Sequence, residues 1–191
     1  MTDPYVRKAR AEGYRSRAAF KLLEVNSRER IVIPGHHVAD LGAAPGGWSQ
    51  VAAQIVGRRG KVVAMDLLEM APVPGVTVLR GDFRDPSMQE SLGAAGGGKF
   101  DVVLSDLSPN LSGIASADQV RAAELVRSAL EFSREHLKTE GSFLVKVFQG
   151  SEFEDVLHEM RETFRKVRVL KPAASRDESR ETYLLGRHLR R

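Results

Sequence analysis

A lysine inside an apolar segment is the first residue whose position suggests chemistry. Lys146 lies within Phe143–Phe148, an aromatic and β-branched run typical of a buried strand. Burying an unpaired ammonium is costly, so Lys146 needs a carboxylate partner. Asp106 follows the apolar run 101–105, and we expect a neighbouring strand to bring it close. Such a pair is either a buried ion pair without chemistry or part of a site that moves a proton.

A glycine-rich turn follows another apolar strand. The stretch from Asp40 to Trp48 is D-L-G-A-A-P-G-G-W, in which Gly42, Gly46 and Gly47 allow the backbone to approach a ligand closely. The spacing is G-x-x-x-G-G rather than G-x-G-x-x-G, so the dinucleotide fingerprint fails and an NAD-dependent oxidoreductase is disfavoured. The alternative is structural, with Asp40 capping a turn and Trp48 serving as a core aromatic.

Two further acidic residues are expected at strand ends. Asp66 can accept hydrogen bonds from both ribose hydroxyls of a nucleoside. Asp82 can accept from an adenine amine while Phe83 packs on the ring, although Asp82 could instead cap the next helix. An acidic pocket suits a positive sulfonium better than it suits NAD, so we expect S-adenosylmethionine as the cofactor. No metal is expected, because the five histidines show no ligand spacing and cysteine is absent.

The elements that must position these residues alternate between strands and helices, which predicts an α/β fold with one seven-stranded, mostly parallel sheet flanked by helices. Strands are expected near 37–41, 61–66, 75–79, 101–105, 141–147, 166–170 and 181–187. Helices are expected near 16–25, 47–56, 84–92, 117–138 and 151–164. The glycine-rich segment 93–98 is expected to be a flexible linker. Ligands bind such sheets at the carboxyl ends of the strands, where the candidate residues fall.

Charge is distributed unevenly along the chain. The formal net charge is +4, whereas residues 1–30 carry +4 and residues 161–191 carry +6, which leaves −6 for the middle. The charge distribution favours a basic N-terminal extension over residues 1–30, which includes the helix expected near 16–25. A single domain over residues 31–191 is expected to follow it. Basic ends can bind a polyanion, although they can also be merely solvated. The candidate RNA-binding residues lie beside tyrosines that allow base stacking: Arg7, Lys8, Arg10, Arg15 and Arg17.

Four stretches together resemble the FtsJ (RrmJ, RlmE) family of ribose 2'-O-methyltransferases from about Tyr14 onward. They are D-L-G-A-A-P-G-G-W-S-Q at 40–50, G-D-F-R-D at 81–85, S-D-L-S-P-N-L-S-G at 105–113 and F-L-V-K-V-F-Q-G at 143–150. The resemblance implies a Rossmann-like class I methyltransferase fold and S-adenosylmethionine as cofactor. It implies cofactor contacts at Gly46, Trp48, Asp66, Asp82 and Asp106. It also implies a catalytic set of Lys21, Asp106, Lys146 and Glu181.

The same resemblance implies the reaction and the partner. The expected substrate is the ribose 2'-hydroxyl of a uridine in 23S rRNA within the large (50S) ribosomal subunit. We interpret Lys146 as the base or as the group that orients this hydroxyl, with Lys21 lowering its proton affinity. A tRNA 2'-O-methyltransferase and a non-catalytic RNA-binding factor in ribosome assembly remain alternatives.

The chain is expected to be a cytoplasmic monomer without a membrane segment. The first residues show no signal peptide, and no run of about 18 apolar residues occurs.

Overall fold

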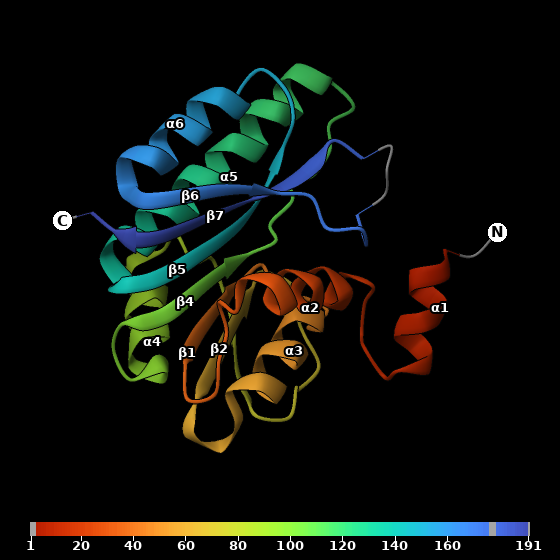
Figure 1. The fold of residues 1–191 in the computed structure, drawn as a ribbon, viewed down its shortest axis with the longest axis vertical. Helices are drawn as coiled ribbons and strands as arrows, with labels where there is room; N and C mark the ends of the chain where they lie inside the picture. The colour runs from red at the N-terminus through yellow and green to blue at the C-terminus, as the bar shows by residue number, and fades with distance from the viewer. Residues whose placement is uncertain (1–2, 176–178, 191) are drawn as a thin grey trace.

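A seven-stranded sheet forms the centre of the structure, a computed structural model that describes residues 3–175 and 179–190 (Figure 1). The strand order is β3-β2-β1-β4-β5-β7-β6. All paired strands are parallel except β7, which runs antiparallel to both β5 and β6. The predicted α/β class and mostly parallel sheet are confirmed.

The strands lie close to their predicted positions, and β5 is longer than expected. They are β1 (His37–Leu41), β2 (Lys61–Asp66), β3 (Val76–Arg80), β4 (Phe100–Ser105), β5 (Leu137–Phe148), β6 (Phe164–Leu170) and β7 (Glu181–Leu189).

Helices cover both faces of the sheet (Figure 1). They are α1 (Pro4–Ala11), α2 (Ala18–Glu29), α3 (Gly47–Val56), the short 3-10 helix η1 (Gly57–Arg59), α4 (Pro86–Gly96), α5 (Ala115–His136) and α6 (Phe153–Thr163). Buried residues of α2 and α3 pack on one face around Val38, Leu104 and Leu144. Buried residues of α4, α5 and α6 pack on the other, around Ala39 and Val103.

Local structure differs from the expectations in two places. Helix α1 was not predicted, because its eight residues carry little apolar pattern and only Ala9 is buried. The segment 93–98 is not wholly a linker, because Gly96 is the last residue of α4. Gly97 caps the helix with a left-handed φ of 77°. Gly96 fits there because a side chain would meet the ring of Phe100, so close packing rather than flexibility explains this glycine.

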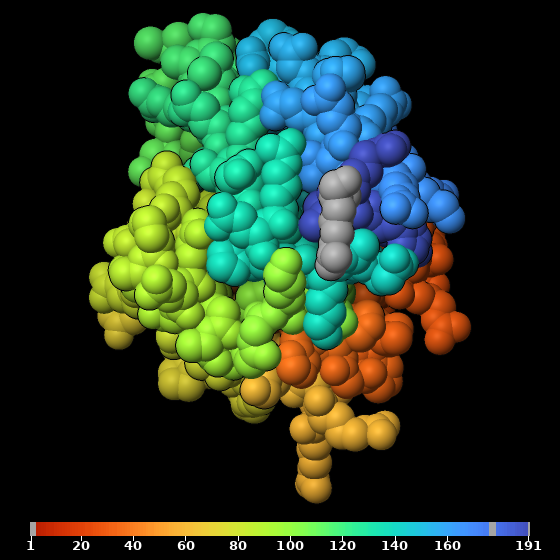
Figure 2. Space-filling view, turned by 90° about the vertical axis from the view of Figure 1, so that its left-hand side faces the viewer, coloured from red at the N-terminus to blue at the C-terminus, as the bar shows by residue number. Residues whose placement is uncertain are grey.

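The carboxyl ends of β1, β2, β4 and β5 lie along one edge of the sheet. Strand β7 has the opposite direction, so its first residue reaches this edge, where Glu181 pairs with Phe148 at the end of β5. The side that carries the C-terminus in Figure 1 faces the viewer in Figure 2. This view shows the other end of β7 together with α4 and α5.

Among the described residues, no helix has the length and apolar character needed to cross a membrane.

Candidate active site

Lys146 and Asp106 meet at the carboxyl edge of the sheet. The Lys146 side chain is buried, and its Nζ lies 3.4 Å from Asp106 Oδ1. Nζ also donates to the main-chain oxygen of Asp106 at 3.1 Å and to Ser108 Oγ at 2.5 Å. Two hydrogen bonds and one ion pair therefore compensate the buried ammonium. The expected contact with Asp106 is present, whereas Ser108 was not among the predicted residues.

A second ion pair joins parts of the chain that are far apart in sequence. Lys21 on α2 donates to Oε1 of Glu181, which begins β7, across a separation of 160 residues. Their side chains keep only 11% and 13% of their surface exposed. The structure therefore brings the two outer members of the predicted catalytic set into contact.

Tyr183 connects the two ion pairs. Its hydroxyl oxygen lies 3.0 Å from Asp106 Oδ1 and 3.1 Å from Glu181 Oε1. A phenol has one hydrogen, so it donates to one carboxylate at a time. Tyr183 was not among the predicted residues, although a signal was present: residues two apart on a strand share a face, and Glu181 was already a candidate.

The carboxyl groups of the cluster have perturbed proton affinities. Burial raises the pKa of Asp106, and the positive charges of Lys146 and Lys21 oppose this effect. Burial would also raise the pKa of Glu181, but the hydrogen bond and charge of Lys21 outweigh it and lower that pKa below its ordinary value. Burial and the two carboxylates raise the pKa of Tyr183 well above its usual range, so this phenol stays protonated. With all four charged groups ionised, the cluster has no net charge.

A cavity of about 440 Å³ opens beside Asp106. Its lining includes five predicted cofactor residues: Gly42, Asp66, Asp82, Phe83 and Asp106. The Asp66 carboxylate accepts from the main-chain N–H groups of Ala44 and Leu68, both at 2.9 Å, and so ties the glycine-rich turn to the end of β2. The volume falls within the range of small-molecule binding sites, roughly 300–1,000 Å³.

A smaller cavity of about 170 Å³ borders the same turn. It shares Gly42 and Asp106 with the larger one, and Asp40, Gly47 and Trp48 also line it. Asp40 Oδ2 accepts from Ser49 Oγ at 2.6 Å, while Oδ1 is buried without a partner among the described residues. Burial raises the pKa of Asp40 to about 7. An orphaned carboxylate oxygen is a suitable partner for a cationic ligand.

Local structure accounts in part for three of the predicted cofactor residues. Trp48 is a core aromatic, as the alternative interpretation held, and its Nε1 donates to the main-chain oxygen of Ala18 at 2.8 Å. Gly46 lines neither cavity, and its φ of 112° is left-handed. Asp82 does not cap α4, because Asp85 occupies the cap position. Instead its carboxylate accepts from the Arg84 guanidinium at 2.7–3.1 Å, which lowers the pKa of Asp82.

A third hollow, about 240 Å³ in volume, opens beside the Lys21–Glu181 pair. Arg17, Lys21, Ser179 and Glu181 line it. The charged cluster therefore borders two spaces, because Asp106 lines the larger cavity and Lys21 and Glu181 line this hollow. A direct transfer requires the reacting atoms of two molecules to meet, and a cluster that borders both spaces is suited to align them.

The candidate RNA-binding residues fall into two groups. Arg7, Lys8 and Arg10 are exposed on α1. The Arg15 guanidinium instead donates to the main-chain oxygens of Pro45, Ala71 and Pro72. The Arg17 guanidinium donates to Asp3 and to the main-chain oxygen of Ala174. The first group is therefore the more exposed of the two.

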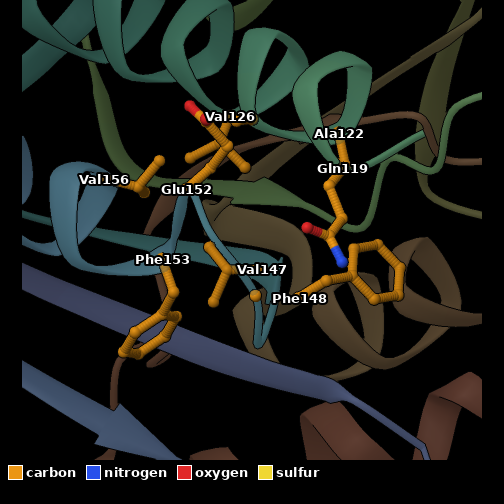
Figure 3. Close-up of a pocket in the computed structure, with 10 residues that line it drawn as sticks. Gln119, Ala122, Val126, Val147, Phe148, Glu152, Phe153 and Val156 are labelled. Atoms are coloured by element: carbon orange, nitrogen blue, oxygen red, sulfur yellow. The ribbon is translucent and has the colours of Figure 1, made fainter. Parts of the chain in front are cut away.

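The apolar pocket in Figure 3 lies between α5, β5 and α6 and is separate from the charged cluster. Val126, Val147 and Val156 are among its lining residues. Its volume of about 20 Å³ is close to the minimum that a single water molecule needs. We assign it to core packing.

The strand order, the glycine-rich turn after β1 and the acidic residues at the following strand ends define a Rossmann-like class I methyltransferase fold. A model of the FtsJ-like methyltransferase family matches residues 14–189. The chain therefore belongs to the FtsJ-like methyltransferase family, as the resemblance implied.

Curated relatives align over nearly the full length. Proteins named ribosomal RNA large subunit methyltransferase E from Chromobacterium violaceum and Dechloromonas aromatica are 53% and 54% identical to this chain. The alignments cover 98% and 100% of this chain, and 92% and 93% of the relatives.

Solved structures share the fold. A ribosomal RNA methyltransferase from Plasmodium falciparum has a TM-score of 0.81 and 25% identity, with 92% of this chain and 98% of that chain covered. A fibrillarin from Aeropyrum pernix, crystallised with bound S-adenosyl-L-methionine, has a TM-score of 0.61 and 18% identity, covering 91% of this chain and 75% of that one. At that identity the likeness concerns the fold alone.

Proposed function

We propose that this chain transfers the methyl group of S-adenosylmethionine to the ribose 2'-hydroxyl of a uridine in 23S rRNA of the large ribosomal subunit. One observation carries the proposal: the Lys21, Asp106, Lys146 and Glu181 cluster borders both a cavity of about 440 Å³ and a hollow of about 240 Å³. The names of the relatives favour ribosomal RNA as the substrate class.

The residues present fit the proposed cofactor. Asp40 and Asp66 offer carboxylates to a cationic nucleoside, and the unpartnered Asp40 Oδ1 needs such a partner. Asp82 and Phe83 would contact the base, and Gly42, Gly46 and Gly47 shape the turn against which the cofactor would lie. When bound, S-adenosylmethionine supplies an electrophilic methyl carbon bonded to a sulfonium.

The protein's part in the reaction is alignment and proton removal. Lys146 would orient the ribose hydroxyl through one N–H, or accept its proton if it is neutral. Lys21 and Glu181 would hold the ribose on the side of the smaller hollow. Asp106 would keep Lys146 in place, and Tyr183 would fix the separation of the two carboxylates. The ribose oxygen would bond to the methyl carbon as the carbon–sulfur bond breaks and the hydroxyl proton leaves. Because the sulfonium would become a neutral thioether, little new charge would have to be stabilised.

The N-terminal region would contribute the RNA contacts. Arg7, Lys8 and Arg10 are exposed on α1, and α1 packs on α2, the helix that carries Lys21. We propose that residues 1–30 form this RNA-facing region of a monomer and that residues 31–191 form the cofactor domain. Arg15 and Arg17 would support the region rather than contact phosphates.

A methyl-transfer assay with separated substrates tests the proposal. The purified chain and labelled S-adenosylmethionine are incubated with large ribosomal subunits, free 23S rRNA or tRNA, and the modified nucleoside is identified by mass spectrometry after nuclease digestion. We expect 2'-O-methyluridine from the subunits. Label only in tRNA would indicate the tRNA alternative, and RNA binding without label would indicate an assembly factor.

A single substitution tests the role of Lys146. In single-turnover experiments Lys146→Ala should lose methyl transfer, with cofactor affinity unchanged. Lys166→Ala, which removes an exposed lysine of β6, is the control. Wild-type turnover by Lys146→Ala would remove this residue from the mechanism.

A further inference from the structure

Ser108 contacts the central lysine of the cluster but belongs to none of the predicted site residues. Its Oγ lies 2.5 Å from Lys146 Nζ, which is the shortest of the three contacts of that ammonium. Ser108 is exposed and lies in the loop after β4, where it lines the larger cavity. It therefore reaches Lys146 from the side at which the methyl donor would bind.

The contact with the carboxylate is the loosest of the three. Lys146 Nζ and Asp106 Oδ1 are 3.4 Å apart, whereas hydrogen bonds between ammonium and carboxylate groups are usually about 2.7–2.9 Å long. Both groups are in a partly buried site, where their attraction is strong. The Lys146 ammonium is thus held away from the Asp106 carboxylate by two other acceptors. These are the Ser108 hydroxyl at 2.5 Å and the main-chain oxygen of Asp106 at 3.1 Å.

We infer that Ser108 is a positioning residue that keeps one N–H of Lys146 available for the substrate oxygen; this inference rests on the proposed function. Two N–H groups are held by Ser108 and by the main chain of Asp106. The third N–H forms no hydrogen bond among the described residues, and Asp106 Oδ1 contributes only an ion pair at 3.4 Å, so a substrate oxygen could accept from this N–H. Without the hydroxyl, Lys146 would close onto the carboxylate as a tight ion pair. That N–H would then be withdrawn from the reaction.

Three serine variants test the inference by separating catalysis from cofactor binding. Ser108→Ala should lower kcat about ten-fold and leave cofactor affinity unchanged, since a hydrogen bond to a charged group is lost. Ser108→Thr keeps the hydroxyl and should restore most of kcat. Ser105→Ala is the matched control, because Ser105 Oγ is buried three residues earlier without a partner among the described residues.

A measurement without turnover tests the same contact. The Lys146 ammonium can be observed by ¹⁵N NMR in protein labelled at lysine and assigned with Lys146→Arg. Ser108→Ala should shift this signal and change its hydrogen exchange, and Ser108→Thr should restore both.

The inference is overturned if Ser108→Ala keeps kcat within two-fold of wild type, or if it weakens only cofactor binding. An unchanged Lys146 signal in Ser108→Ala, or a Ser108→Thr variant as slow as Ser108→Ala, would also overturn it. Failure of the proposed function is distinguishable, because wild-type protein would then transfer no methyl group while the NMR comparison still reports on Ser108.

Discussion

Asp40 shows how burial at one residue couples proton binding to folding. Its carboxyl is buried at the end of β1, its pKa rises from 3.8 to about 7, and one oxygen has no partner among the described residues. Above pH 4 the unfolded chain releases this proton, whereas the folded chain keeps it until about pH 7. This group therefore lowers the free energy of unfolding as pH rises across that interval, and its contribution stays constant above it.

A cationic ligand should reverse the effect. A positive charge beside Asp40 favours the carboxylate, so we expect cofactor binding to release up to about one proton near pH 6 and to tighten as pH rises through 7. Isothermal titration in two buffers of different ionisation enthalpy counts the protons. Asp40→Asn should release none and show no such pH dependence. Equal proton release by wild type and Asp40→Asn would mean that another group titrates.

Arg15 illustrates a residue whose type suggested one role and whose contacts indicate another. Its guanidinium binds three main-chain oxygens, of which Pro45 belongs to the glycine-rich turn and Ala71 and Pro72 to the loop after β2. The sequence shows a basic residue in a basic segment, which predicts phosphate contact. Every residue type has a main-chain oxygen, so the sequence does not indicate which of these oxygens the Arg15 guanidinium contacts.

Substitution of Arg15 tests the contact. A lysine keeps the charge but cannot offer a fork of donors, so Arg15→Lys should weaken cofactor binding about ten-fold by loosening the turn. Arg7→Lys, on exposed α1, should bind cofactor as wild type does. The measurement is cofactor affinity by titration in the absence of RNA. Unchanged affinity in Arg15→Lys would show that the turn holds its shape without this clamp.

At the scale of elements, most of the sheet could be predicted because short apolar runs end at polar residues. The expected neighbours β4 and β5 do pair, and this pairing is what places Asp106 near Lys146. Helix α1 could not be predicted from apolar pattern, because it is held by a few contacts among Ala9, Phe20 and Ala174. Its Asp3 cap and Pro4 start are nevertheless a recognisable helix signal.

Helix α4 provides a matched pair of glycines. A side chain at Gly93 would meet nothing within 4 Å, whereas one at Gly96 would lie 2.5 Å from the Phe100 ring. Gly93→Ala should raise the free energy of unfolding by about 0.5–1 kcal/mol, because alanine favours the helix. Gly96→Ala should lower it by about 1–3 kcal/mol through overpacking. Chemical denaturation measures both, and equal effects at the two positions would contradict this assignment of the helix end.

At the scale of the whole molecule, α1 presents the exposed Arg7, Lys8 and Arg10, and its cap residue Asp3 accepts from Arg17, which lines the hollow beside Lys21 and Glu181. Binding of RNA by this surface should depend steeply on salt, because each neutralised phosphate releases counterions. Replacing Arg7, Lys8 and Arg10 with glutamine should reduce the slope of log affinity against log salt by roughly two to three units.

A control with the same loss of charge distinguishes position from net charge. Arg58, Arg59 and Lys61 are exposed around η1 and the start of β2, at the opposite end of the strands. Their replacement with glutamine should leave the salt slope nearly unchanged. Filter binding to 23S rRNA at several salt concentrations measures both variants. Equal loss of slope would indicate that RNA senses only the overall charge of the protein.

The antiparallel insertion of β7 has a consequence for biosynthesis. During translation the glycine-rich turn is synthesised early, but Glu181 emerges from the ribosome well over a hundred residues after Lys21. Until β7 has been synthesised, the apolar strand β5 is an unpaired edge strand that can pair with strands of other chains. A nascent chain would thus complete the cavity of about 440 Å³ before the cluster of Lys21, Asp106, Lys146 and Glu181, and it would be most prone to self-association in the interval between the two.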